Sequence, residues 1–327
     1  MDTDASSVRE IVDPHHHLWS IEDHGGAAGE FLLADLRADI GPLPVTQTVF
    51  IECGVHYRGD GPEHLRTVGE TEWVAGIAQV SEETPGATIA GIVGHTDLAL
   101  PIDELDEALD AHEAAGGGRF RGIRDALASA PPGVPLLIPG PALRDKSADP
   151  AFRRGVAHLG ERGLTYDSWH YHIQNRDFRD LARAVPGTTM VLDHFGTPLG
   201  TGPWEGRRDE VFESWKPDIA EIAQCPNVVA KLGGLAMPDN GFTWHLDPAN
   251  RPDVAGFLAE QGRWYHHTIE QFGPERCMFE SNFPVDKYSL DYDVVWAAFA
   301  AIAAEYSAAE QDAMFSGTAR RIYRLEP

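Results

Sequence analysis

The sequence predicts one α/β domain, residues 1–327, with the fold of a (β/α)8 TIM barrel. Short β-branched runs alternate along the chain with longer amphipathic stretches. The runs are almost continuously apolar, which is typical of parallel strands that are buried on both faces. The length of 327 residues accommodates a barrel of about 250 residues together with loop insertions.

Eight runs are candidate strands of this barrel. In chain order they are Ile11–Asp13, Thr48–Cys53, Thr88–Gly94, Phe120–Arg124, Leu164–Asp167, Thr189–His194, Asn227–Leu232 and Cys277–Ser281. The amphipathic stretches predict helices over Glu63–Val80, Asp103–Ala115, Ala151–Arg162, Phe178–Ala184, Asp209–Ala223, Asp253–Phe272 and Tyr292–Tyr306. A final helix from Ala308 to about Arg324 is expected to close the ring.

The connections favour a closed barrel over a doubly wound open sheet. An open sheet would normally carry a glycine-rich phosphate loop after its first strand, where this chain has three histidines. Gly116, Gly117 and Gly118 precede a strand instead and predict a turn. Pro131–Pro141 and Gly196–Lys216 are predicted loop insertions on the catalytic face, where the loops that follow barrel strands gather.

Composition excludes several classes of protein. The net charge of −25 argues against a nucleic-acid partner, because phosphate contacts require clustered Lys and Arg. No apolar stretch approaches the roughly 18 residues of a membrane span. The three scattered cysteines predict neither a disulfide framework nor a cysteine zinc site. Met1–Glu10 shows no secretory signal, so we expect a cytoplasmic protein.

The strongest chemical signal follows the first strand, in Asp13-Pro14-His15-His16-His17. Side chains alternate across an extended segment, so His15 and His17 are expected to point one way and His16 the other. Two imidazoles on one side of a strand can bind one metal ion. The segment therefore predicts a metal site at the mouth of the barrel.

The chain here resembles the amidohydrolase-related metal-dependent hydrolases, in particular the branch of sugar-lactone and dicarboxylate-lactone hydrolases. The resemblance spans almost the whole chain, because its blocks occur in the family's order. They are Ile11–Trp19, Phe120–Arg124, Tyr166–Gln174, Val191–Gly196 and Met278–Pro284.

This resemblance implies that His15, His17 and His194 are metal ligands, with Zn²⁺ as the ion and Mn²⁺ as the alternative. His172 follows as a further ligand or a catalytic group that polarises the substrate, and it is preferred over His170 because Tyr-His-x-Gln matches the family. His194 is expected inside the barrel mouth, with its neighbour Asp193 pointing between the barrel and the helices.

Further polar residues end the predicted strands. Glu52 is placed to complete the metal site, to act as a base or to pair with an arginine. Arg121 and Arg124 are candidates to bind a carboxylate or lactone oxygens, because guanidinium offers a bidentate fork. Their separation of three residues points them to opposite sides, so one would instead be a structural partner. Lys231 and Trp169 are further candidates for substrate binding.

The sequence departs from the family at the eighth strand. The usual pattern there is Ser-Asp-x-Pro, whereas this chain has Ser281-Asn282-Phe283-Pro284. An amide cannot take a proton, so Asn282 can only orient a water or bind the metal through its oxygen. Asp286, Glu52 and Glu280, in that order, are the candidates for the base.

Three functions are consistent with the sequence. The first is a hydrolase that opens a lactone or related cyclic ester. The second is a non-oxidative decarboxylase of an aromatic or enoic acid, and the third is a catalytically silent protein that binds a small carboxylate. In each case the partner is a small molecule, with neither nucleic acid nor membrane, and the resemblance makes a homodimer the candidate assembly.

Overall fold

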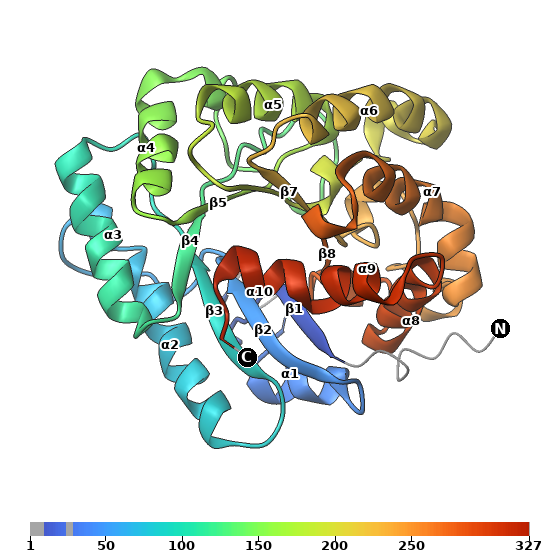
Figure 1. Ribbon diagram of the computed structural model, residues 1–327, viewed down its shortest axis with the longest axis horizontal. Coiled ribbons are helices and arrows are strands. Elements are labelled where there is room, and N and C mark those ends of the chain that lie inside the picture. Colours follow the sequence, from blue (N-terminus) through green and yellow to red (C-terminus); the bar gives the residue numbers. More distant parts are fainter. Residues whose placement is uncertain (1–9, 24–28, 327) are drawn as a thin grey trace.

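The computed structural model describes residues 10–23 and 29–326. Most of the N-terminal segment on which the expected absence of a secretory signal depends lies outside these residues. Eight parallel strands pair in sequence order and form a nearly closed barrel (Figure 1). The strands are β1 (Ile11–His16), β2 (Val45–Ile51), β3 (Thr88–Gly94), β4 (Phe120–Arg124), β5 (Thr165–Ser168), β6 (Met190–Leu192), β7 (Val228–Leu232) and β8 (Cys277–Phe279).

Hydrogen bonds just beyond β8 join the last strand to the first. The amide of Asn282 donates to the carbonyl of His15 at 3.0 Å, and the amide of His17 donates to the carbonyl of Phe283 at 2.7 Å. Asp13 adds a side-chain contact, because its carboxylate accepts from the Ser281 amide and from the Tyr292 hydroxyl, both at 2.9 Å. Burial raises the pKa of Asp13 to about 6. The closure brings the ends of β1 and β8 together, where the candidate histidines lie.

Helices surround the barrel in the predicted alternation. They are α1 (Leu33–Ile40), α2 (Val68–Glu83), α3 (Ile102–Gly116), α4 (Pro150–Glu161), α5 (Asn175–Ala184), α6 (Arg208–Ala223), α7 (Val254–Phe272) and α8 (Tyr292–Ala303), followed by α9 (Ala308–Asp312) and α10 (Thr318–Tyr323). The start of α4 shows local capping: the Asp149 side chain accepts from the Ala151 amide at 2.8 Å, with Pro150 as the first residue of the helix. No described helix is long and apolar enough to cross a bilayer.

One helix of the ring was not predicted, and the C-terminal helical stretch is present over nearly the predicted range but lies outside the ring. The first helix of the ring is α1. Its sequence gives no start signal, because a leucine, Leu32, occupies the N-cap where Ser, Thr, Asp or Asn would mark the start. The C-terminal segment does not complete the ring. It forms α9, a π-helical turn over Ala313–Gly317 and α10, and the side chains of Ala319, Ile322 and Tyr323 pack against apolar residues of the strands.

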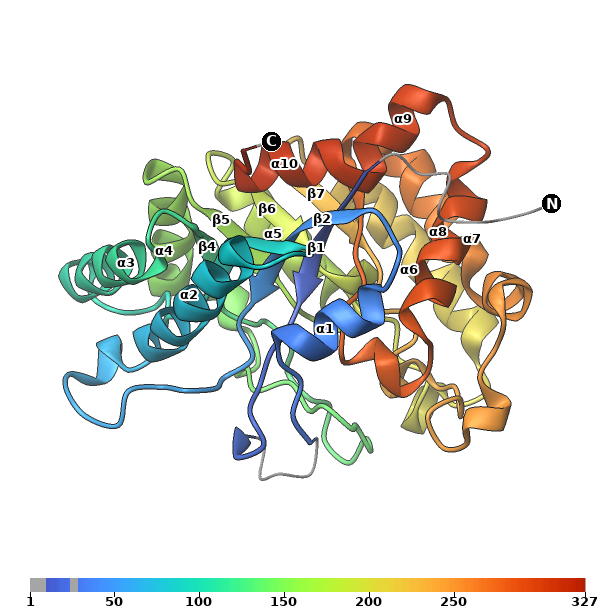
Figure 2. The same cartoon turned by 90° about the horizontal axis from the view of Figure 1, so that it is seen from below.

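The two ends of the barrel therefore have different roles. Figure 2 shows α10 at one end and the long loops that follow the strands at the other. The predicted insertion over Pro131–Pro141 is a loop without helix or strand. The second insertion is shorter than predicted, because α6 begins at Arg208. The loop end is where the polar residues of the strands meet.

Candidate functional site

The first strand places His15 and His17 side by side, as the alternation predicts. Their Nε2 atoms lie 3.2 Å apart, whereas Nε2 of His16 turns away and lies 3.0 Å from the Thr48 hydroxyl. The Nδ1 atom of His17 is 2.8 Å from the carbonyl of Ile51. A carbonyl can only accept, so this nitrogen carries the proton, and the Nε2 lone pair of His17 is available to bind a metal.

A buried carboxylate, Glu280, lies between two imidazoles. Its Oε2 atom is 2.7 Å from Nδ1 of His15, and its Oε1 atom is 2.7 Å from Nδ1 of His194. One ligand atom from each of the three residues lies within 4.8 Å of the other two. All three side chains are buried. Imidazole and carboxylate donors at this spacing suit a divalent transition metal such as zinc.

Strained backbone positions bring these groups together. His194 has φ +54° and Asn282 has φ +55°, a region that residues other than glycine rarely adopt. The strand ends at Leu192, and this turn carries the His194 ring to a centroid distance of 4.5 Å from that of His15. Strain of this kind gathers at functional sites, where the surrounding structure enforces it.

Buried charges lie next to the histidines. Lys231 Nζ is 2.9 Å from Asp167 Oδ2, 3.2 Å from Asp193 Oδ1 and 3.2 Å from His15 Nδ1. The expectation that Asp193 points between barrel and helices was therefore wrong. Lys231 itself is fully buried below the histidines, so its position favours a role in holding the site rather than in touching substrate.

The balance of these charges suits a dication. Three buried carboxylates, those of Asp167, Asp193 and Glu280, surround the single ammonium of Lys231. Three carboxylates against one ammonium leave an excess of two, and the guanidinium of Arg124, 3.9 Å from Asp193, is balanced by Glu52. Burial and the neighbouring cation Lys231 hold the pKa of His15 well below its usual range, and burial with Arg124 does the same for His17. Both imidazoles are therefore neutral, as metal ligands must be.

Replacing Lys231 by methionine is expected to destabilise the fold by about 3–5 kcal/mol, because the change leaves two buried carboxylates without a counter-ion. Urea denaturation followed by circular dichroism measures the difference. Lys216→Met is the matched control, since Lys216 pairs with Glu213 on the partly exposed face of α6 and its loss should cost less than about 1 kcal/mol. Equal losses in the two variants would show that the buried cation has no special role.

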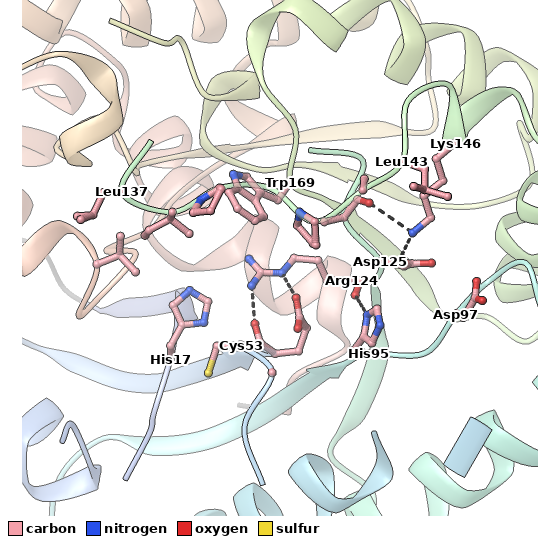
Figure 3. Close-up of a pocket in the computed structure, with 18 of the residues that line it drawn as sticks. His17, Cys53, His95, Asp97, Arg124, Asp125, Leu137, Leu143, Lys146 and Trp169 are labelled. Atoms are coloured by element: carbon pink, nitrogen blue, oxygen red, sulfur yellow. Dashed lines mark hydrogen bonds and ion pairs between the residues drawn. The ribbon is translucent and has the colours of Figure 1, made fainter. Parts of the chain in front are cut away.

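A cavity of about 1280 Å³ opens above these residues at the loop end of the barrel. His17 and Arg124 line it, and Figure 3 shows both side chains at the cavity. Arg124 Nε donates to Glu52 Oε1 at 2.6 Å, and the same guanidinium also donates to the Glu52 carbonyl. This pairing is one of the roles predicted for Glu52, and it leaves Nη1 of Arg124 3.4 Å from His15 Nε2.

Asn282 and Asp286 form a second pair at the end of β8. The Asn282 amide donates to Asp286 Oδ1 at 2.9 Å, and the Ala236 amide donates to Oδ2 at 3.2 Å. Burial raises the pKa of Asp286 to about 7. A carboxyl group with such a pKa exchanges a proton near neutral pH.

Two of the predicted residues lie apart from this site. Arg121 donates to the carbonyls of Gly118 and Phe120 at the opposite end of β4, so its position does not support substrate binding. His172 accepts from the Leu199 amide at 3.2 Å, and its ring packs edge-on against Trp204. Burial lowers the pKa of His172 to about 4. Its contacts favour a role in holding the loop after β6.

Asp167 was not among the predicted site residues, Asp193 was expected to point away from the mouth, and Glu280 was expected only as a base. A signal for all three is present in the sequence. Asp193 and Glu280 directly follow the apolar strands β6 and β8, Asp167 lies one residue before the end of β5, and strands β5 to β8 are neighbours. Carboxylates at the same end of adjacent parallel strands must meet.

Comparisons with known proteins identify the family of the chain. The family model described as amidohydrolase matches residues 12–325. An uncharacterized protein of Sinorhizobium fredii is 31% identical over 96% of this chain and 98% of its own length. An L-fucono-1,5-lactonase of Burkholderia multivorans is 28% identical, with 96% of each chain covered. The structure of an amidohydrolase from Burkholderia multivorans with bound zinc superposes with a TM-score of 0.75 and 25% identity, over 97% of this chain and all of the other. The chain belongs to the amidohydrolase family.

Proposed function

We propose that this protein is a metal-dependent hydrolase that opens a small lactone to a hydroxy acid. The observation that carries the proposal is the buried group of His15, His194 and Glu280, next to a cavity that His17 lines. The relatives named as lactonases and the zinc-bound amidohydrolase support it. The substrate is a small molecule that enters the cavity from the loop end.

The ion of this proposal is Zn²⁺, held by His15, His194 and Glu280, while His17 approaches the other nitrogen of the His15 ring from the side of the cavity. The donor chemistry fits zinc, and the excess of two negative charges fits a dication. A bound divalent ion polarises a carbonyl group and lowers the pKa of a coordinated water to about 7. Mn²⁺ is the alternative that the same donors accept.

The protein's own side chains bind the substrate and move the proton. Arg124, held in place by Glu52, donates to an oxygen of the lactone, and the Trp169 ring lines the cavity wall. Asp286 takes the proton from the attacking water, and the Asn282 amide orients its carboxylate. The water oxygen adds to the carbonyl carbon of the lactone, the ring C–O bond then breaks, and Asp286 returns the proton to the leaving alkoxide. The carboxylic acid that forms ionises and releases one proton to the solvent.

A panel of lactones followed with a pH indicator tests this function. Ring opening is expected to release protons without CO₂, and removal of the ion with a chelator should abolish the turnover until zinc is restored. Release of CO₂ from an aromatic or enoic acid would instead assign the protein as a decarboxylase. Tight binding of a lactone or carboxylate without turnover would identify a silent binder.

A further inference from the structure

We propose that the substrate is an uncharged lactone with an apolar arm, and that the arm lies along the segment 137–143 at the cavity's edge. The inference rests on the proposed lactonase function and adds to it the chemical class of the substrate. Figure 3 shows Leu137, Trp169 and Leu143 along one side of the cavity, with His17, Cys53 and His95 along the other. We call the segment 137–143 the apolar wall.

The apolar wall is fixed by side chains from two other loops. The carboxylate of Asp239 accepts from the amides of Leu137 at 2.7 Å and Ile138 at 3.2 Å. The hydroxyl of Tyr171 accepts from the Gly140 amide at 2.7 Å and donates to the Ile138 carbonyl at 3.1 Å. These contacts satisfy the backbone of the wall and hold its side chains at the cavity before any ligand binds.

Large apolar side chains at the wall are left open to solvent. Leu137 is 57% exposed and Leu143 is 81% exposed, and both line the cavity. Tyr57 and Tyr288, from two other loops, also line it and are 37% and 38% exposed. A bare lactone ring would leave these surfaces in water. Pockets for drug-sized ligands span roughly 300–1,000 Å³. A cavity of about 1280 Å³ therefore accommodates a molecule much larger than a bare lactone ring.

The charges at the cavity disfavour an anionic substrate. Arg124 already pairs with Glu52, and Lys146 pairs with Asp125. Acidic side chains outnumber basic ones among the lining residues, with five carboxylates against three cations: Glu52, Asp97, Asp125, Asp145 and Asp149 against Arg124, Arg144 and Lys146. A net negative cavity repels a carboxylate and leaves a neutral ligand unaffected.

Binding of 2-alkyl tetrahydropyrans, measured by calorimetry on the metal-loaded protein, tests the wall. These rings have no carbonyl and cannot be opened, so binding is separated from turnover. Affinity is expected to rise roughly two- to fourfold for each methylene added over the first few carbons, as burial of apolar groups predicts. A terminal carboxylate on the chain should abolish the gain.

In the double variant Leu137→Ser, Leu143→Ser, the affinity should no longer rise with the length of the alkyl chain. The matched control is Val80→Ser, Ile102→Ser, which removes two exposed apolar side chains that do not line the cavity and should leave the series unchanged. The inference would be overturned if the affinity of the wild type did not rise with the length of the alkyl chain, or if it rose equally in the double variant. A changed sedimentation coefficient in the double variant, with an unchanged dependence of affinity on chain length, would assign the apolar wall to self-association. That result would also overturn the inference.

The lactone panel separates this inference from the proposed function. Turnover of simple and long-chain lactones with equal kcat/KM, together with a flat binding series, would leave the function standing and overturn the apolar arm. A steep binding series without turnover of any lactone would retain the apolar subsite and remove the lactone chemistry.

Discussion

Replacing His15 and His17 together by alanine is expected to abolish metal binding. The wild-type protein should carry about one divalent ion per chain, and the variant should lose more than about 100-fold in affinity, which exceeds the loss typical of changes outside the direct ligands. The reason is geometric: the variant removes His15 from the group of three donors, and it removes His17, whose Nε2 atom lies 3.2 Å from that of His15. Elemental analysis after dialysis measures the occupancy, and lactone turnover should fall in parallel.

His16→Gln is the control for this experiment. His16 lies on the same strand between the two candidate ligands, but its ring bonds the Thr48 hydroxyl on the outer face. A glutamine can keep a hydrogen bond to Thr48, so the variant should retain the ion. Circular dichroism and thermal unfolding show whether the alanine variant is folded. Full occupancy in a folded double-alanine variant would refute the assignment of the metal site.

The change Asp286→Asn should lower kcat by about 10²–10⁴-fold, the usual contribution of a positioned acid or base. It should also change the pH profile. The pKa of Asp286 is raised to about 7 by burial, and the base is the ionised form. The kcat/KM of the wild type should therefore rise with pH through about 7, and this limb should be missing in the variant.

Two comparison variants separate the base from the other carboxylates. Glu52→Gln releases Arg124, so we expect a raised KM with a smaller change in kcat. Glu280→Gln removes a metal donor, so its loss of activity should follow the loss of the ion. If kcat of all three variants stays within a few-fold of the wild type, Asp286 is not the base.

The change Asn282→Asp tests the pair that Asn282 forms with Asp286. It places a second carboxylate at the position from which Asn282 Nδ2 now donates to Asp286 at 2.9 Å. Repulsion between like charges should raise the apparent pKa of the pair, so the limb near pH 7 should move to higher pH. Activity that appears only in this variant, with none in the wild type, would show that the natural protein is a silent binder.

The sequence alone determined the fold and the directions of the histidines on the first strand. Continuous apolar runs that alternate with amphipathic stretches are a local property, and they predicted all eight strands. The strand period of two predicted that His15 and His17 share a side and that His16 does not, because side chains alternate along an extended chain. The separation of Arg121 from Arg124 predicted their opposite directions by the same argument.

Only the tertiary structure decided the partners of the polar groups. The left-handed turn at His194 breaks the strand period, so Asp193 and His194 both approach His15, which alternation would not allow. Glu280 was expected as a base of last choice, and closure of the barrel places it between two histidines instead. Glu52 could have bound a metal or an arginine, and Arg124, 72 residues away in the chain, lies close enough to bind it. Such pairings depend on how distant strand ends meet, and a single sequence does not contain those distances.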